Sequence, residues 1–172
     1  MKRLLFAALL VLIPNTLIPG QQHDGKTWIK FTSEPGRFSA LLPVQPTQQT
    51  ETTPSDHGDY ITHMFIAKSG LNVYVIAWVD YDPSFQFRPT NELDANRDNF
   101  TKGLNATLVS SHNLILNGYQ ALEFTAETSE ATYRSRVFIV GRRPYQLVVR
   151  TSKGIEDKEN TKRFFESFTV KP

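Results

Sequence analysis

The 172-residue sequence contains no cysteine. Disulfide bonds, thiol catalysis and cysteine-based metal sites are therefore excluded. A domain without disulfide bonds must be held together by its hydrophobic core. A chain of about 150 residues can build such a core, because it buries roughly 70% of its unfolded surface on folding. The length therefore predicts one core-stabilised domain.

Two common catalytic motifs are missing as well. The sequence has no Gly-x-Ser-x-Gly segment, which would place a serine nucleophile on a tight turn. Its nine glycines are scattered instead of forming a phosphate-binding loop. We therefore expect a protein that is not an enzyme, binds no cofactor and holds no metal ion.

Long apolar runs are absent except near the beginning of the chain. Ten apolar residues occupy positions 4–13, after two basic residues and before Pro14. This layout is typical of a secretory signal peptide, and the run is shorter than the about 20 apolar residues that span a bilayer. An amphipathic or buried first helix is the alternative. A helix with one polar side would alternate its residue types, which this run does not do.

The beginning of the chain sets the expected organisation and location. We predict a signal peptide over residues 1–20, a polar lead-in over 21–26 and a single domain over 27–172. The protein is then exported, either periplasmic or secreted, with no stable membrane anchor after cleavage. Residues 1–20 hold two of the 19 basic residues and none of the 17 acidic ones, so the rest of the chain has a formal charge of zero. A neutral domain has little general attraction for nucleic acid or anionic lipid, and neither is an expected partner.

Alternating apolar residues and turn signals predict an antiparallel sheet of about seven strands with a helix on each face. Residues 72–80 are apolar on both faces, which indicates a central strand that is covered on both sides. Asn117-Gly118 is a two-residue hairpin signal. A following turn at Ser129-Glu130 would place Glu123 opposite Arg136, so that opposite charges pair across the two strands.

Two segments have helical character. The first is predicted over residues 91–104, with Asn91 as the N-cap and Gly103 near the C-cap. The second is predicted over residues 157–168. One face of this helix carries Thr161, Phe164, Phe165 and Phe168, and we expect it to pack against the core.

The best metal-site candidate is the polar segment Asp56-His57-Gly58-Asp59, followed by His63. Imidazole and carboxylate groups are suitable ligands for zinc and other divalent ions. The spacing matches no known ligand motif, however, and the same residue types are common in turns for conformational reasons. A metal-assisted hydrolase that uses His57 and His63 is therefore only an alternative hypothesis.

The segment 81–89 is rich in aromatic residues and ends beside an arginine, which is typical of interface hot spots. The alternative is that its phenylalanines pack onto the core, as most large apolar residues do. A second candidate is the basic turn at Arg142-Arg143. The possible protein-contact surface consists of Tyr81, Phe85, Phe87, Arg88, Arg142 and Arg143.

Three stretches carry a resemblance to a known group. Residues 28–33 (WIKFTS) and 36–43 (GRFSALLP) resemble the opening of small exported bacterial domains of the Mog1/PsbP-like group, and residues 163–170 (RFFESFTV) resemble their closing helix and strand. The resemblance spans nearly the whole chain after the leader. It implies an α/β/α sandwich built on an antiparallel sheet, and it suggests protein binding rather than catalysis.

These observations lead to one main hypothesis and one further alternative. The main hypothesis is an exported, non-enzymatic binding or accessory domain that acts through contacts with an unknown protein partner. The alternative is a carrier of a small apolar ligand held between sheet and helix, suggested by the 12 phenylalanines.

Overall fold

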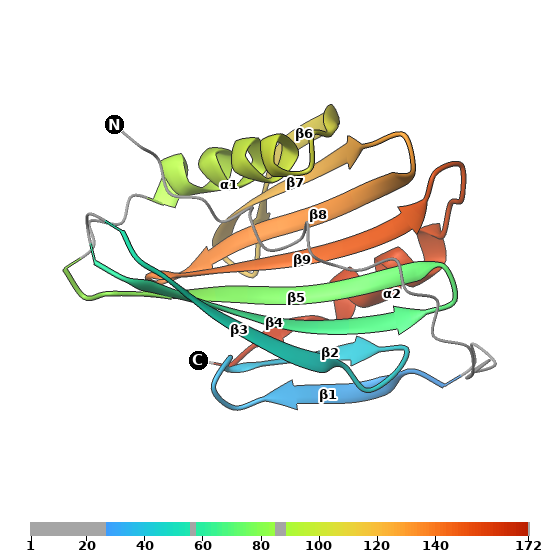
Figure 1. Ribbon diagram of the computed structural model, residues 1–172. Helices are drawn as coiled ribbons and strands as arrows, with labels where there is room; N and C mark the ends of the chain where they lie inside the picture. The colour runs from blue at the N-terminus through green and yellow to red at the C-terminus, as the bar shows by residue number, and fades with distance from the viewer. Residues whose placement is uncertain (1–26, 56–57, 85–88, 172) are drawn as a thin grey trace.

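The computed structural model describes residues 27–55, 58–84 and 89–171, without the side chains of Pro89 and Thr90. The predicted signal peptide and lead-in lie outside the described residues. A seven-stranded antiparallel sheet dominates the fold, as predicted (Figure 1). In spatial order its strands are β3 (Thr47–Thr53), β4 (Tyr60–Ser69), β5 (Asn72–Tyr81), β9 (Arg143–Ser152), β8 (Ala131–Val140), β7 (Tyr119–Glu127) and β6 (Thr107–Leu116).

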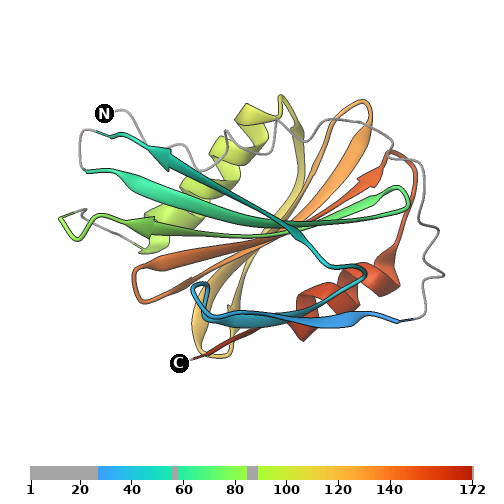
Figure 2. The same ribbon diagram turned by 60° about the horizontal axis from the view of Figure 1, so that its bottom comes forward.

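Two helices and a second sheet cover this main sheet. Helix α1 (Pro89–Gly103) packs on β7 and β8 from one face. Helix α2 (Lys158–Ser167) lies on the other face, beside a three-stranded sheet (Figure 2). The strands of this smaller sheet are β1 (Ile29–Ser33), β2 (Phe38–Leu42) and β10 (Thr169–Val170), with β2 in the middle. The sequence did not predict this second sheet.

The core on the α2 face is aromatic. Phe38 of β2 is fully buried, and its ring lies 5.8 Å from that of Trp78 and 5.2 Å from that of Phe168. These rings come from the smaller sheet, the main sheet and the end of α2, so their contacts join all three parts. Aromatic pairs of this kind add about 0.5–1.5 kcal/mol each beyond the burial of their surface.

The core on the α1 face is mainly aliphatic. Its centre is formed by Leu93 and Phe100 of α1, which pack toward β7 and β8. Strand β5 contributes Val73, Val75 and Ala77 to this core and Tyr74 and Trp78 to the opposite one. The prediction that this strand is covered on both faces is therefore confirmed.

The predicted hairpins are also confirmed. Asn117 and Gly118 both have positive φ angles, 51° and 84°, as a two-residue turn of this kind requires. Glu123 lies opposite Arg136 in the β7–β8 register, and the two side chains form an ion pair of 2.6 Å.

Helix α1 begins two residues before the predicted residue 91 and ends one residue before the predicted residue 104. The helix begins at Pro89 and not after an Asn91 cap, because proline suits the first helical position, where no intrahelical N–H is needed. At the other end Gly103 is the last helical residue, near the C-cap as predicted, and the residue in the left-handed conformation is Asn105, with a φ of 49°. The N–H groups of Asn105 and Ala106 donate to the carbonyl groups of Lys102 and Thr101, which closes the last turn.

No helix among the described residues is long and apolar enough to cross a membrane.

Candidate functional site

The structure brings part of the predicted contact surface together at one end of the main sheet. Tyr81 is the last residue of β5, Arg143 is the first residue of β9, and Arg142 lies in the turn before it. Because β5 and β9 are antiparallel neighbours, these ends meet. Phe85, Phe87 and Arg88 lie outside the described residues. The role of this surface in binding stays a prediction.

Both arginines make contacts within the chain. Arg143 donates from Nε to Asp80 Oδ1 at 2.7 Å and from Nη1 to the carbonyl oxygen of Pro35 at 2.9 Å. Arg142 Nη2 donates to the carbonyl oxygens of Asp82 and Pro83, both at 3.3 Å. Two hydrogen bonds from Ser84 hold the pKa of the Asp82 carboxyl below its usual range. The basic turn therefore fixes the start of the segment that follows β5.

His63, the described member of the proposed metal pair, lies in a network at the same end. Its Nε2 is 3.3 Å from Asp80 Oδ2, and its ring stacks on Trp78 at 4.5 Å. His57 lies outside the described residues. Over the residues that the structure describes, no group of three or more His, Cys, Asp or Glu side chains could hold a metal ion. The contacts of His63 are those of a strand residue that joins β4 to β5.

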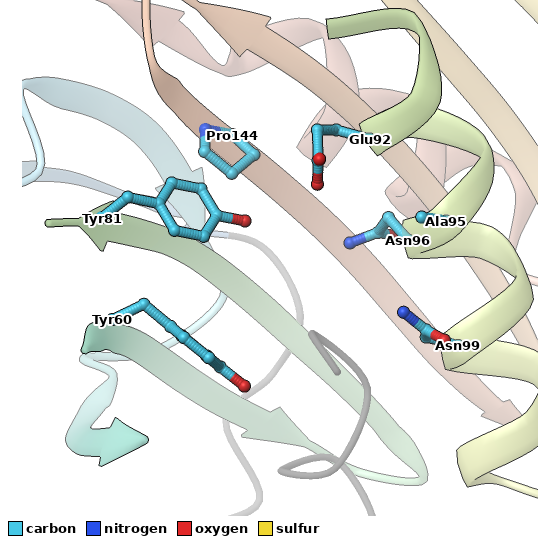
Figure 3. Close-up of a pocket in the computed structure, with 7 residues that line it drawn as sticks. All are labelled: Tyr60, Tyr81, Glu92, Ala95, Asn96, Asn99 and Pro144. Carbon is cyan, nitrogen blue, oxygen red and sulfur yellow. The ribbon is translucent and has the colours of Figure 1, made fainter. Parts of the chain in front are cut away.

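A small polar pocket lies between this end of the sheet and α1. Figure 3 shows Tyr81 and Tyr60 on the sheet side and three polar side chains of α1 on the other. The lining consists of Tyr60, Tyr81, Glu92, Ala95, Asn96, Asn99 and Pro144. Its volume of about 10 Å³ is room for about one water molecule. The pocket is therefore too small for an organic substrate.

Burial controls the ionisation of the groups around this pocket. It raises the pKa of Glu92 above the ordinary value for a carboxyl group, and it raises the pKa of Tyr60 and of Tyr81. The neutral forms are favoured because burial penalises the charged ones. The pocket thus combines a carboxyl group and two phenols that all resist losing their protons.

Asn96 connects the pocket to a buried polar chain under α1. It is only 5% exposed, and its Nδ2 donates to Gln146 Oε1 at 3.3 Å. Gln146 in turn donates to Ser135 Oγ at 3.0 Å. Asn96 Oδ1 has no hydrogen-bond partner among the described residues. The pocket residues were not identified from the sequence. A signal was present, because Asn96 lies on the same helix face as Leu93 and Phe100, and a polar residue in an apolar stripe indicates a buried polar site.

The most exposed apolar side chains of the main sheet lie on its edge strand β6. Leu108, Val109 and Ile115 are 42%, 56% and 67% exposed. The strand pairs only with β7, and over its ten residues it has no proline and no Lys, Arg, Asp or Glu. An edge strand offers a row of unpaired backbone N–H and C=O groups, which proteins usually protect with charges or prolines.

The opposite edge, β3, is protected in the usual way. Its sequence TQQTETT is entirely polar and carries Glu51, and Pro46 and Pro54 flank it. On β6 the only comparable feature is a bulge between Leu108 and Ser110, which disturbs one end of the strand. Residues 110–116 run in regular register with β7. We call this uncharged, regular segment the β6 edge.

Comparison with known proteins identifies the fold. No protein-family model matches the chain, and no curated protein matches it. The solution structure of cyanobacterial PsbP (CyanoP) from Synechocystis sp. PCC 6803 is similar, with a TM-score of 0.54 and 12% identity over 88% of this chain and 98% of that one. A protein of Bacteroides thetaiotaomicron VPI-5482 has a TM-score of 0.40 and 15% identity. That match covers 83% of this chain and only 48% of the other, so this chain spans about half its length.

At 12% identity the likeness to CyanoP concerns the fold alone. The match nevertheless covers most of both chains. The chain therefore has the PsbP-like fold that the resemblance in its sequence predicted.

Proposed function

We propose that this chain is an exported, non-enzymatic binding domain that acts through contacts with a protein partner. The observation that carries the proposal is the β6 edge, a regular edge segment with no formally charged side chain, in a strand that exposes apolar residues toward both of its ends. Such an edge can accept an extended segment of another protein as an additional strand. In that mode of recognition the backbone hydrogen bonds supply affinity and the alternating side chains supply specificity.

The chemistry of the edge suggests the kind of segment that fits it. Ile115 faces the α1 side, while Leu114 and Leu116 pack partly against the core on the α2 side. His112 is the one titratable residue of the strand and lies 3.9 Å from Glu123. A matching partner segment is extended and uncharged, and it places apolar side chains beside these leucines and Ile115.

Two further observations support the proposal. Export is suggested by the basic start and the apolar run within residues 1–20. At the end of the sheet that carries Tyr81, the pocket has room for about one water molecule only, so no organic substrate fits at that end.

The test uses a photo-crosslinking amino acid at position 110 of the exported protein, with partners identified in extracts from its own source. The variant Asn113→Lys adds a charge to the β6 edge, and Gln49→Lys adds the same charge to β3 as a matched control. We expect one protein to be crosslinked in the parent and in Gln49→Lys, and to be lost in Asn113→Lys. A synthetic peptide of the crosslinked partner segment should then bind the parent and fail to bind Asn113→Lys. Thermal unfolding checks that both variants fold.

Three results would contradict the proposal. The first is equal crosslinking in the parent and in Asn113→Lys. The second is a crosslink only to another copy of this chain, which would assign the edge to self-association. The third comes from a crosslinker at Ser84, beside the predicted contact surface: a partner captured only there would move the contact to the Tyr81 end of the sheet.

A further inference from the structure

Two adjoining cavities lie along α2, on the face of the main sheet that α2 covers. The larger has a volume of about 540 Å³, and the smaller one of about 220 Å³. Arg136, Phe165 and Glu166 line both, so the two form one continuous groove. We call the larger part the apolar chamber and the smaller part the basic mouth.

The apolar chamber has hydrophobic walls contributed by several elements and a polar remainder that includes Arg136 and Glu166. The hydrophobic walls are the buried Phe138, Leu147, Phe165 and Phe168 and the partly buried Leu116 and Val170. Small-molecule sites are typically cavities of about 300–1,000 Å³ with mostly hydrophobic walls and a few polar groups. A water-sized unit takes about 30 Å³ of liquid volume, so the chamber holds on the order of 18 methylene-sized units. This is room for one hydrocarbon chain.

The basic mouth carries an excess of positive charge. Its lining has four basic residues, Arg134, Arg136, Lys158 and Lys162, against the acids Glu123 and Glu166. Lys162 lies 3.9 Å from Glu166, and Lys158 lies 2.9 Å from Glu156 outside the lining. The side chains of both pairs are more than 60% exposed. Exposed pairs of this kind contribute little energy, so their cations remain available to an anionic ligand.

Arg136 stands where the two parts meet. Its Nε and Nη2 donate to Glu123 Oε2 at 2.8 and 2.6 Å, and its guanidinium lies 4.8 Å from the centre of the Phe165 ring. The ion pair and the ring hold the guanidinium in a fixed position between the hydrophobic walls and the lysines. A charged head group beside it would leave its hydrocarbon chain directed toward the chamber.

A second, independent observation concerns Thr161, which lines the basic mouth. The residue is only 6% exposed, yet its hydroxyl has no hydrogen-bond partner in the part of the chain that the structure describes. Buried polar groups nearly always have a partner, because an unpaired one costs free energy. An oxygen-rich head group in the mouth would supply the missing acceptor.

We propose that this groove binds a single-chain amphipathic carboxylate of the fatty-acid type, with the hydrocarbon chain in the apolar chamber and the carboxylate at the basic mouth. The volume of the chamber matches one chain of up to about 18 carbons. The excess of cations selects an anion over a neutral or cationic head. This site is independent of strand addition at β6, so the two proposals can fail separately.

The test measures binding by titration calorimetry below the micelle concentration, with decanoate, decanol and decyltrimethylammonium as chain-matched probes. We expect decanoate to bind the full chain at one site, and the other two probes to bind at least about tenfold more weakly. Lys162→Gln combined with Arg136→Gln should weaken decanoate about tenfold and leave decanol unchanged. Lys30→Gln, the same substitution on the exposed face of β1, is the matched control and should change nothing.

Because Arg136 also bridges two strands, its variant could lose stability. In that case Lys162→Gln alone tests whether the basic mouth binds the carboxylate. The ammonium group of Lys162 is exposed and supports no core contact, so this variant should fold normally. Leu116→Trp, which adds bulk at the end of the chamber, should weaken decanoate and decanol alike. No saturable binding of any probe would overturn the site, and equal binding of decanoate and decyltrimethylammonium would overturn the carboxylate. Unchanged decanoate affinity in Lys162→Gln would place the head group elsewhere and also contradict the proposal.

Discussion

The guanidinium of Arg143 and the carboxylate of Asp80 form an ion pair, with Nη2 2.6 Å from Oδ1. The pair lies just beyond the last ladder contact between β5 and β9, which joins Trp78 to Tyr145. Asp80 also contacts His63 and accepts a hydrogen bond from Trp78. One carboxylate therefore ties β4, β5 and β9 together at the end of the sheet that carries the predicted contact surface.

Replacing this carboxylate should weaken the end of the sheet. We expect Asp80→Ala to lower the free energy of unfolding by about 1–2 kcal/mol, the range for hydrogen bonds to charged groups, reduced because Asp80 is partly exposed. Urea denaturation measures the change. Glu34→Ala removes the exposed pair with Lys171 and should stay within about 0.5 kcal/mol. Equal effects of the two substitutions would contradict the structural role of Asp80.

Glu92 in the pocket under α1 should reduce stability at neutral pH. Burial raises the pKa of this carboxyl group in the folded protein, so ionisation at pH 7 is less favourable folded than unfolded. A raised folded value stabilises the fold at low pH, and this contribution is lost as the pH rises through the folded pKa. Glu92→Gln should therefore be more stable than the parent at pH 7 by less than about 1 kcal/mol. The difference should vanish near pH 4, as measured by denaturation at both pH values; a difference that stays constant with pH would refute this cause.

Tyr74 should make the protein sensitive to alkali. Burial, followed by the charge of Asp157, raises the pKa of its phenol to about 12. Between about pH 10 and 12 the unfolded chain loses this proton while the folded chain keeps it, so stability falls as the pH rises. The raised pKa of Tyr74 contributes on the order of 2 kcal/mol to the free energy of unfolding below pH 10, and this stabilisation is lost as the pH rises to about 12. Tyr74→Phe should show a shallower fall in urea denaturation measured from pH 9 to 11.5, and an identical fall would exclude Tyr74 as its source.

The unpaired hydroxyl of Thr161 offers a stabilising substitution. Valine has nearly the same shape and removes the buried polar group, so Thr161→Val should raise the free energy of unfolding by roughly 1 kcal/mol. Thr101 is the matched control, because its hydroxyl donates to the carbonyl oxygen of Arg97 at 3.0 Å. Thr101→Val should be neutral or destabilising in the same denaturation experiment. A loss of stability in Thr161→Val would show that the hydroxyl is satisfied.

Local signals explain which parts of the fold could be predicted. The Asn117-Gly118 turn fixes the β6–β7 register, and the short turn after β7 then places Glu123 opposite Arg136. In the smaller sheet such a signal marks only the turn between β1 and β2, at Glu34-Pro35-Gly36. Its central strand pairs with a two-residue β10 at the other end of the chain, as in the contact of Val170 with Phe38, and short-range patterns do not report such distant partners.

The candidate sites were less predictable for the same reason. Tyr81 and Arg143 were named from their residue types, but their proximity depends on β5 and β9 being neighbours, although they are distant in sequence. The α2 groove was anticipated only as a general possibility, a ligand held between sheet and helix. Its position depends on which part of the sheet the smaller sheet leaves uncovered, and this cannot be read from the periodicity of any one segment.

The pairing of β10 with β2 has a consequence for the order of folding. Ser39 Oγ lies 2.9 Å from Thr169 Oγ1 across 130 residues of sequence, and the N–H of Lys171 donates to the carbonyl oxygen of Arg37 at 2.7 Å. Contacts between such distant residues form slowly, because a long loop must close first. A nascent chain that still lacks residues 169–171 cannot complete the layer beside α2. The smaller sheet should therefore close late in folding, only after this distant segment has been synthesised.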